Sequence, residues 1–226
     1  MRVALDGPGS SGKSSVGAAA AVQLGYRFLD TGIVYRAITL AAVLRHIDPT
    51  DEARLVAVVP EIGLLADEHG LLRRVTLAGE DVTDRIHVPE VDRQVSAVSA
   101  QPAVRQALLG LQREVAAPGS VILAGRDIGT VVLPDAELKL YLDVSIEERA
   151  RRRAAERGLD PDSPAAARIL EELRRRDHRD GSRKVAPMRV PDDAVIVRSD
   201  DLTFEQSVAR VVAIIRERAE QGPEHE

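Results

Sequence analysis

The chain has 226 residues, which predicts one α/β domain with an insertion or two small domains, and its 44% hydrophobic content is typical of a globular protein. It contains no cysteine, which excludes disulfides and thiolate chemistry and favours a reducing compartment, so we expect a cytoplasmic protein. The net charge of −5, the 2% aromatic content and the lack of a long apolar run argue against nucleic-acid and membrane partners.

The first predicted unit is strand 2–6, a glycine-rich loop and helix 13–24. Because a strand starts so early, we expect no signal peptide. The loop Gly7-Pro8-Gly9-Ser10-Ser11-Gly12-Lys13-Ser14 fits the P-loop pattern G-x-x-x-x-G-K-[ST], whose backbone N–H groups and following helix bind phosphate. Lys13 is expected to reach the β- and γ-phosphates of a nucleoside triphosphate, and the Ser14 hydroxyl to bind Mg²⁺.

The next elements are predicted from apolar periodicity. A strand at 26–29 ends at Asp30, and Thr31 is expected to N-cap a helix that runs to His46. A short helix at 51–59 is followed by three short antiparallel strands and two helices, at 62–66, 72–77, 79–82, 88–99 and 102–115. We expect residues 62–99 to form an insertion into a core domain of residues 1–61 and 100–220.

The last third of the chain alternates strands with helices. Strands are predicted at 121–124, 138–142 and 194–197, and helices at 145–157, 164–179 and 203–220. Ser145 with Glu148, and Thr203 with Gln206, are expected to form capping boxes, and the tail 221–226 is expected to fray. The alternation predicts an α/β fold with three layers around a mainly parallel sheet.

Polar residues follow several predicted strands. In an open parallel sheet, ligands bind beyond the carboxyl ends of the strands, so the P-loop, Asp30-Thr31 and Arg126-Asp127 are expected to face one site. Arg126 could bind a phosphate and Asp127 could orient Mg²⁺ or a substrate hydroxyl, or the two could form a surface ion pair in a turn. Arg36 and Arg105 are candidates for a second phosphate, or solvated helix residues.

The densest charge signal is the arginine run at 149–183. Two arginine-bearing helices joined by a Gly/Asp/Pro turn indicate a lid over phosphates, which would exclude water during phosphoryl transfer. The alternative is a charged coat with pairs such as Glu148–Arg152 and Glu172–Arg176. We place the lid at about 149–163.

Beyond the P-loop, the chain resembles the bacterial cytidylate kinase family in an ordered series of motifs that spans most of residues 2–190. These motifs are Leu29-Asp30-Thr31-Gly32-x-x-Tyr35-Arg36, Leu77-Ala78-Gly79-Glu80-Asp81-Val82-Thr83, Val95-Ser96, Val104-Arg105-x-Ala107-Leu108-Leu109-x-x-Gln112-Arg113, Gly125-Arg126-Asp127-Ile128-Gly129-Thr130-Val131-Val132 and Arg176-Asp177-x-x-Asp180-x-x-Arg183-x-x-Ala186-Pro187. The resemblance implies a P-loop kinase fold with a monophosphate-binding insertion and a helical lid.

The resemblance also implies roles for individual residues. The nucleoside monophosphate would be surrounded by Thr31, Arg36, Ser96, Arg105, Arg126, Asp127, Arg176, Asp180 and Arg183. Of these, Ser96, Arg105 and Asp180 would contact the cytosine and sugar, and Arg36, Arg126 and Arg183 the phosphate. The donor ATP would lie against Gly7, Pro8, Gly9, Ser10, Ser11, Gly12, Lys13, Ser14, Ser15, Arg149, Arg153 and Arg157. The catalytic set would be Lys13, Arg126, Asp127, Arg153 and Arg183.

The implied reaction is the phosphorylation of CMP and dCMP by ATP with Mg²⁺, catalysed by a monomer. No water-activating base stands out in the chain, and an acceptor phosphate needs none because its oxygen is already anionic. Two alternatives stay open at this point. One is another small-molecule kinase of the same fold, for adenylate or shikimate, and the other is a regulatory ATP-binding module without an acceptor.

Overall fold

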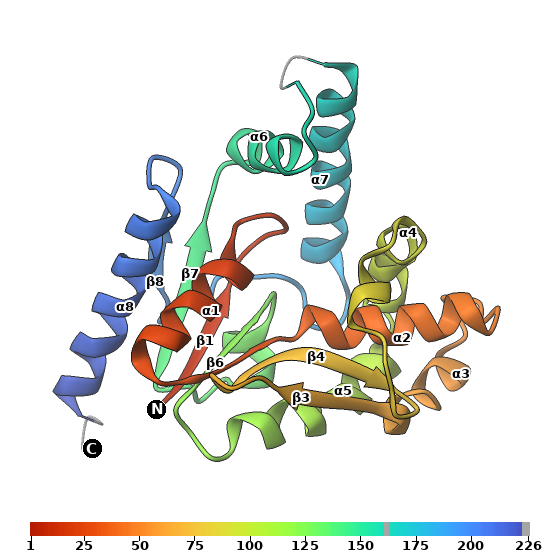
Figure 1. Ribbon diagram of the computed structural model, residues 1–226, viewed down its shortest axis with the longest axis horizontal. Coiled ribbons are helices and arrows are strands. Elements are labelled where there is room, and N and C mark those ends of the chain that lie inside the picture. The colour runs from red at the N-terminus through yellow and green to blue at the C-terminus, as the bar shows by residue number, and fades with distance from the viewer. Residues whose placement is uncertain (161–162, 223–226) are drawn as a thin grey trace.

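The computed structural model describes residues 1–160 and 163–222 and is built on one eight-stranded sheet (Figure 1). The strand order is β3-β4-β2-β6-β1-β7-β8, and β5 pairs with β4. The strands are β1 (Arg2–Asp6), β2 (Arg27–Asp30), β3 (Ile62–Ala66), β4 (Leu71–Leu77), β5 (Glu80–Asp81), β6 (Val121–Gly125), β7 (Leu138–Asp143) and β8 (Val195–Arg198). Neighbouring strands from β4 to β8 in this order pair in parallel, whereas β3 and β5 run antiparallel to β4.

Helices cover both faces of the sheet. They are α1 (Lys13–Leu24), α2 (Gly32–Leu44), α3 (Glu52–Val56), α4 (Pro89–Val98), α5 (Pro102–Ala116), α6 (Ile146–Glu156), α7 (Pro164–Ser182) and α8 (Phe204–Gln221). The short helical turns are η1 (Val59–Glu61), η2 (Thr83–His87) and the π-helical η3 (Ile128–Val132). In Figure 1, α1 and α8 lie on one side of the sheet, α2 and α5 on the other, and α6 and α7 stand at its upper edge. The three-layer arrangement predicted from the sequence is confirmed.

Two apolar cores explain why the central strands read as continuous hydrophobic runs. Strand β6 is buried along its whole length, with Ile122 facing the core under α1 and α8 and Leu123 facing the core under α2 and α5. A parallel strand covered by helices on both faces needs apolar side chains at every position. The strands therefore end where polar residues begin, and those ends share one edge of the sheet.

The expected insertion is joined to the central sheet. The hairpin of β3 and β4 is antiparallel, as predicted, but β4 also pairs in parallel with β2, where Leu71 lies opposite Phe28 and Leu72 opposite Leu29. After β5 the chain forms η2 and α4, which pack against α2. The segment 62–99 thus extends the sheet and places α4 beside its carboxyl-terminal edge.

Helix caps follow the predictions in part. Thr203 and Gln206 form the expected capping box. Ser145 accepts from the N–H of Glu148, but the carboxylate of Glu148 binds two arginines, so the second half of that box is missing. Thr31 is the N-cap residue of α2 as predicted, but its hydroxyl accepts no hydrogen bond from the first turn and instead donates to the carbonyl of Ala124. Gln221 is the last residue of α8, and the rest of the expected tail, 223–226, lies outside the described residues.

Candidate functional site

A cavity of about 730 Å³ opens at the carboxyl-terminal edge of the sheet, between the P-loop, α4, α6 and α7. All nine expected acceptor residues line it: Thr31, Arg36, Ser96, Arg105, Arg126, Asp127, Arg176, Asp180 and Arg183. Seven expected donor residues line it as well: Ser10, Gly12, Lys13, Ser14, Ser15, Arg153 and Arg157. The structure therefore gathers residues from distant parts of the sequence around one space.

The remaining expected donor residues are buried and do not line the cavity: Gly7, Pro8, Gly9, Ser11 and Arg149. Gly7 is needed for packing, because a Cβ there would lie 2.7 Å from the carbonyl oxygen of Leu142. Arg149 has a different environment from the one expected for a lid arginine. Its guanidinium donates to the carbonyl of Gly9 at 3.0 Å and to that of Val144 at 3.1 Å, and pairs with Asp177 at 2.6 Å.

The P-loop has the backbone geometry that its sequence predicts. Gly12 has φ +88° directly before α1, and Ser10 has φ +59°. Lys13 is 5% exposed, and its ammonium donates to the carbonyl of Pro8 at 3.1 Å. Burial, reinforced by the neighbouring Arg126, lowers the pKa of Lys13 well below its usual value. A lysine whose charge is disfavoured in this way gains most from an anion placed beside it.

The side chains of Ser14 and Asp30 lie next to each other beside the P-loop and are joined by a hydrogen bond. The Ser14 hydroxyl donates to one carboxylate oxygen of Asp30, whose other oxygen accepts from the N–H of Gly32 at 2.8 Å. Among the described residues there is no cluster of three or more acidic or histidine side chains that could enclose a metal. Mg²⁺ is usually held by one or two protein oxygens together with phosphate and water, so the hydroxyl of Ser14 beside Asp30 fits that ion.

Two expected phosphate contacts are held by one carboxylate. Arg126 Nε donates to Asp180 Oδ2 at 3.2 Å, and Arg183 Nη2 donates to Asp180 Oδ1 at 2.6 Å. Burial alone would raise the pKa of Asp180, but Arg126 and Arg183 hold it below its usual value. Asp180 therefore stays ionised and orients both guanidinium groups at the cavity wall.

A second buried pair lies beside the first. Arg105 donates to a carboxylate oxygen of Asp127, and its guanidinium carbon lies 5.3 Å from the centre of the Tyr35 ring. Arg105 also donates to the carbonyl of Ser99 at 3.0 Å, and Arg183 reaches that carbonyl at 3.4 Å. The alternative of a surface turn pair between Arg126 and Asp127 is wrong, because each residue pairs with a partner from another helix.

Asp92 of α4 lies between an arginine of α2 and an arginine of α6. Arg36 donates to Asp92 Oδ1 at 2.7 Å, and Arg153 of α6 lies 3.9 Å from Asp92 Oδ2. The side chain of His87 is nearby, and partial desolvation together with Arg36 lowers its pKa. The sequence patterns did not single out Asp92, since one acid on an amphipathic helix is usually solvated.

Arg176 lacks the carboxylate partner that its neighbours have. Within the described part of the chain it forms no ion pair, and its buried Nε has no hydrogen-bond partner. Burial and the nearby Arg126 lower its pKa to about 10. A Cβ on Gly9 would lie 3.4 Å from Arg126 and 3.6 Å from Arg176, so both arginines lie against the P-loop. The expected pair Glu172–Arg176 is therefore wrong, whereas Glu148–Arg152 is present at 2.7 Å.

The cavity is strongly cationic although the whole chain is acidic. Twelve arginine or lysine side chains and six carboxylates line it, while the net charge of the chain is −5.

One of these cations, Arg152, was missed as a site residue. It donates to Glu148 and to the carbonyl of Ser199, and it borders Gly12. Such a cavity is suited to a ligand with several negative charges.

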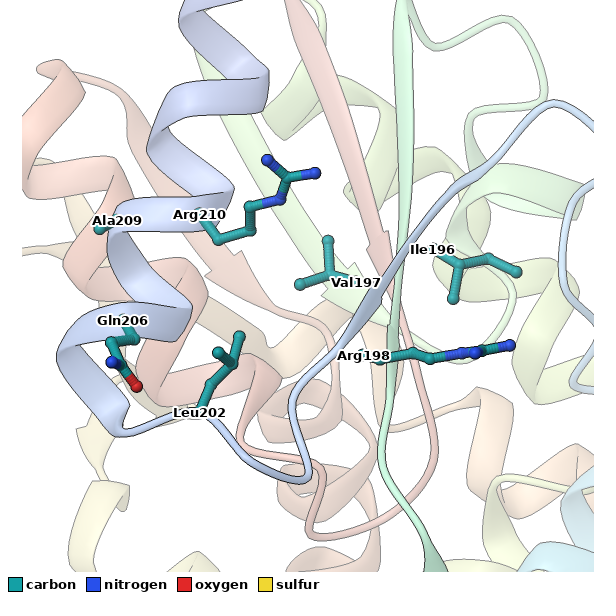
Figure 2. Close-up of a pocket in the computed structure, with 7 residues that line it drawn as sticks. All are labelled: Ile196, Val197, Arg198, Leu202, Gln206, Ala209 and Arg210. Atoms are coloured by element: carbon teal, nitrogen blue, oxygen red, sulfur yellow. The ribbon is translucent and has the colours of Figure 1, made fainter.

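A second pocket, of about 780 Å³, lies between β8 and α8, on the far side of β7 from the P-loop strand (Figure 2). It is lined by Ile196, Val197, Arg198, Leu202, Gln206, Ala209 and Arg210. Figure 2 shows Ile196 and Arg198 extending away from α8, whereas Val197 faces it. No group of charged side chains converges there, and none of the expected site residues takes part.

The comparisons with known proteins agree with the motif series. The family model for cytidylate kinase matches residues 3–217. Cytidylate kinase of Mycobacterium avium (strain 104) is 46% identical over 222 residues, which is 96% of each chain. Cytidylate kinase of Caldanaerobacter subterraneus subsp. tengcongensis is 42% identical over 216 residues, covering 96% of this chain and 95% of the relative.

Solved structures support the fold only. The chain resembles an uncharacterized protein from Eubacterium ventriosum with a TM-score of 0.51 at 12% identity, covering 96% of this chain and 98% of that one. A shikimate kinase from Bacteroides thetaiotaomicron gives a TM-score of 0.48 at 15% identity, with 96% of this chain and 98% of that one covered. Only the first of these likenesses bears on architecture, and at 12% identity it says nothing of substrate.

Proposed function

This chain belongs to the cytidylate kinase family, and we propose that it transfers the γ-phosphoryl group of ATP to the phosphate of CMP or dCMP. The products are ADP and CDP or dCDP. The observation that supports this most directly is the cationic cavity, which has the P-loop on one wall and the Arg126–Asp180–Arg183 group beside it. One cavity can thus hold two phosphate-bearing substrates next to each other.

We assign the donor phosphates to the P-loop. Backbone N–H groups at the start of α1 face the cavity and carry the positive end of the helix dipole. Lys13 is fixed by its bond to Pro8, so its ammonium is available to the transferring phosphoryl group with little loss of conformational freedom. Arg153 and Arg157 of the lid segment supply further charge from the opposite side.

We assign a magnesium ion to the oxygens of Ser14 and Asp30. Bound there with ATP, the ion would neutralise charge on the β- and γ-phosphates during transfer. In the structure the Ser14 hydroxyl donates to Asp30, and both residues line the cavity. Asp30 stays anchored through its second oxygen to the N–H of Gly32.

We assign the acceptor phosphate to Arg126, Arg183 and Arg176. The first two are oriented by Asp180, whereas Arg176 has no carboxylate of its own and is best placed to gain from the substrate. Arg105, Asp127 and Ser96 also line the cavity, and we assign them to the nucleoside. An acceptor phosphate oxygen is already a nucleophilic anion, so the protein needs to orient it and to neutralise charge.

One assay tests the function against its two alternatives. ADP release from MgATP is measured with CMP, dCMP, UMP, AMP, shikimate and water as acceptors. We expect rapid release with CMP and dCMP and only background release with water. A preference for AMP or shikimate would indicate another kinase of this fold, and release that no acceptor changes would indicate a regulatory module.

We propose further that the enzyme is a monomer and that it is cytoplasmic. In the described part of the chain, no helix is both long and apolar enough to cross a membrane. Both substrates are small, water-soluble anions, and the residues assigned to them come from a single chain. Sedimentation at micromolar concentration should give a species of 24.5 kDa.

A further inference from the structure

Asp6 is a buried carboxylate to which the assignments above give no role. It ends β1, which lies between β6 and β7 in the sheet, and its side chain is fully buried. In the sheet it lies opposite Gly125 of β6 and Tyr141 of β7. The next residue along the chain opens the P-loop, and the residue after Gly125 is Arg126, so Asp6 lies where the donor and acceptor loops leave the sheet.

Both oxygens of Asp6 bind the segment that follows the acceptor loop. The N–H of Ile128 donates to Oδ1 at 2.8 Å, and the N–H of Gly129 donates to Oδ2 at 2.7 Å. These two groups open the π-helical turn η3, so Asp6 supplies the acceptors that the start of that turn lacks. The carboxylate thereby connects the strand before Gly7 to the backbone just after Asp127.

We propose that Asp6 is a positioning residue for phosphoryl transfer, which holds the Arg126–Asp127 loop at a set distance from the P-loop. It touches neither substrate and acts through the backbone of Ile128 and Gly129. This inference rests on the proposed function, because it assigns Arg126 to the acceptor phosphate. A displacement of about 1 Å between reacting groups can cost roughly 100-fold in rate.

The electrostatics of Asp6 oppose folding, which argues for a functional reason to keep it. Burial raises the pKa of Asp6 to about 6, an effect that the two backbone hydrogen bonds limit. The charged groups around it are Lys13, which favours the carboxylate, and Asp127, which disfavours it; Tyr141 is the titratable neighbour on β7. A buried group with a raised pKa lowers stability at neutral pH, and functional sites often carry such groups.

Protonation should therefore move stability and activity in opposite directions. Between the ordinary pKa of an aspartate, near 4, and about 6, the native state binds the proton more readily than the unfolded state, so lowering the pH through 6 favours the fold. The protonated carboxyl has one oxygen that donates, and it can no longer accept well from both N–H groups. The connection to η3 weakens at the pH where the fold gains stability from this residue.

The test compares Asp6→Asn with the wild type. The amide keeps one acceptor and turns its NH₂ toward the other N–H. We expect kcat/KM for CMP to fall about 10- to 100-fold, with KM for ATP changed by less than about twofold. The ratio of wild-type to variant kcat/KM for CMP should shrink as the pH falls from 7.5 to 5. The acceptor phosphate also titrates near pH 6, but it does so equally in both proteins.

Val211→Ala is the matched control, since Val211 is buried in α8 and lies in the core away from the cavity. It should lower the melting temperature without changing KM for CMP. A folded Asp6→Asn variant with wild-type kcat and KM would overturn the inference. A loss of activity in Asp6→Asn that is proportional to its loss of melting temperature at every pH would also overturn the inference.

Amide hydrogen exchange of the wild type gives a second readout that needs neither activity nor the variant. At pH 7.5 the amides of Ile128 and Gly129 should be protected, and their protection relative to β6 amides should fall at pH 5. Unchanged relative protection would overturn the inference even if Asp6→Asn fails to fold. Absence of CMP-dependent ADP release in the wild type would instead overturn the proposed function, and the exchange data would still judge the role of Asp6 at η3.

Discussion

At the residue scale, most of the site arginines are held by carboxylates of the protein itself. Asp180 holds Arg126 and Arg183, and Asp127 holds Arg105. Burying such pairs costs desolvation free energy that their attraction only partly offsets. The gain is orientation, because a guanidinium that is already fixed loses little freedom when phosphate arrives.

Replacing Lys13 should lower the activity of the enzyme without lowering its stability. Its lowered pKa means that its charge opposes folding at neutral pH, so Lys13→Met should leave the melting temperature unchanged or slightly raised. We expect kcat to fall by roughly 100-fold or more, as for the loss of a group that neutralises transition-state charge. Steady-state kinetics and thermal unfolding measure the two effects. Lys139→Met, which removes a pair with Asp193, is the control; near wild-type turnover of Lys13→Met would contradict the mechanism.

Replacing Asp180, in contrast to Lys13, should lower the stability of the fold and also weaken CMP binding. Asp180→Ala leaves Arg126 and Arg183 without a counter-charge in a buried place, which should cost about 3 kcal/mol of unfolding free energy. It also frees both guanidinium groups, so we expect KM for CMP to rise about tenfold while KM for ATP stays within about twofold. Urea unfolding and initial rates measure these changes. An unchanged KM for CMP would remove Asp180 from the acceptor site.

The types of residue around the cavity could be predicted from the sequence, and so could the partner of Arg152 within one helix, but partners from distant elements could not. Residues at strand ends were expected to meet because carboxyl ends of parallel strands share an edge, and Arg126 and Asp127 do lie there. Which acid binds which arginine depends on helix packing, so Arg126 pairs with Asp180, 54 residues away. The family resemblance implied that Arg149 contacts ATP, yet in the structure its guanidinium donates to the carbonyls of Gly9 and Val144.

At the element scale, α6 and α7, the two helices proposed as the lid, rest on few apolar contacts. Helices α6 and α7 share a small core of Ala150, Ala154, Ala166, Ile169 and Leu173. Arg149 connects that pair to the rest of the molecule, through Gly9 of the P-loop and Val144 after β7, and it joins α6 to α7 through Asp177. Elements with small cores and polar connections open at low free energy, which suits a lid that must admit two substrates.

Two arginines of α6 should therefore differ when replaced by methionine. Arg149→Met removes three structural bonds, so we expect both the melting temperature and kcat to fall, with kcat down about tenfold or more. Arg153→Met removes only exposed or distant pairs, so the melting temperature should hold while kcat/KM for ATP falls about tenfold. Differential scanning fluorimetry and initial rates distinguish them. Equal losses of stability would contradict this division of roles.

Local patterns predicted the regular elements and missed those that depend on distant partners. The helices and strands with clear periodicity, such as α5 and β6, lie where the sequence placed them. The pairing of β4 with β2 and the turn η3 could not be read locally, because one needs a neighbouring strand and the other the carboxylate of Asp6. Residues 161–162 of the expected lid lie outside the described residues.

At the scale of the whole molecule, positive side chains are concentrated at the cavity although the chain as a whole is negative. The chain carries a net charge of −5, while the cavity wall holds twice as many cations as carboxylates. Mutual repulsion among the cavity cations is visible in Lys13 and Arg176, whose pKa values are lowered by burial and by Arg126. Without phosphate, this repulsion works against the folded state, so anionic ligands should stabilise the fold as well as bind.

The last prediction follows from that linkage. A ligand that binds only the native state at 100 times its Kd adds about 2.7 kcal/mol of stability, which for a chain of this size should raise the melting temperature by about 5–10 °C. CMP without ATP should therefore raise the melting temperature, and cytidine at the same concentration should raise it far less, since it lacks the phosphate that neutralises Arg176. Arg176→Met should reduce the shift caused by CMP while leaving the small shift caused by cytidine intact. Equal shifts with CMP and cytidine would mean that the nucleoside, and not the cationic wall, carries acceptor binding.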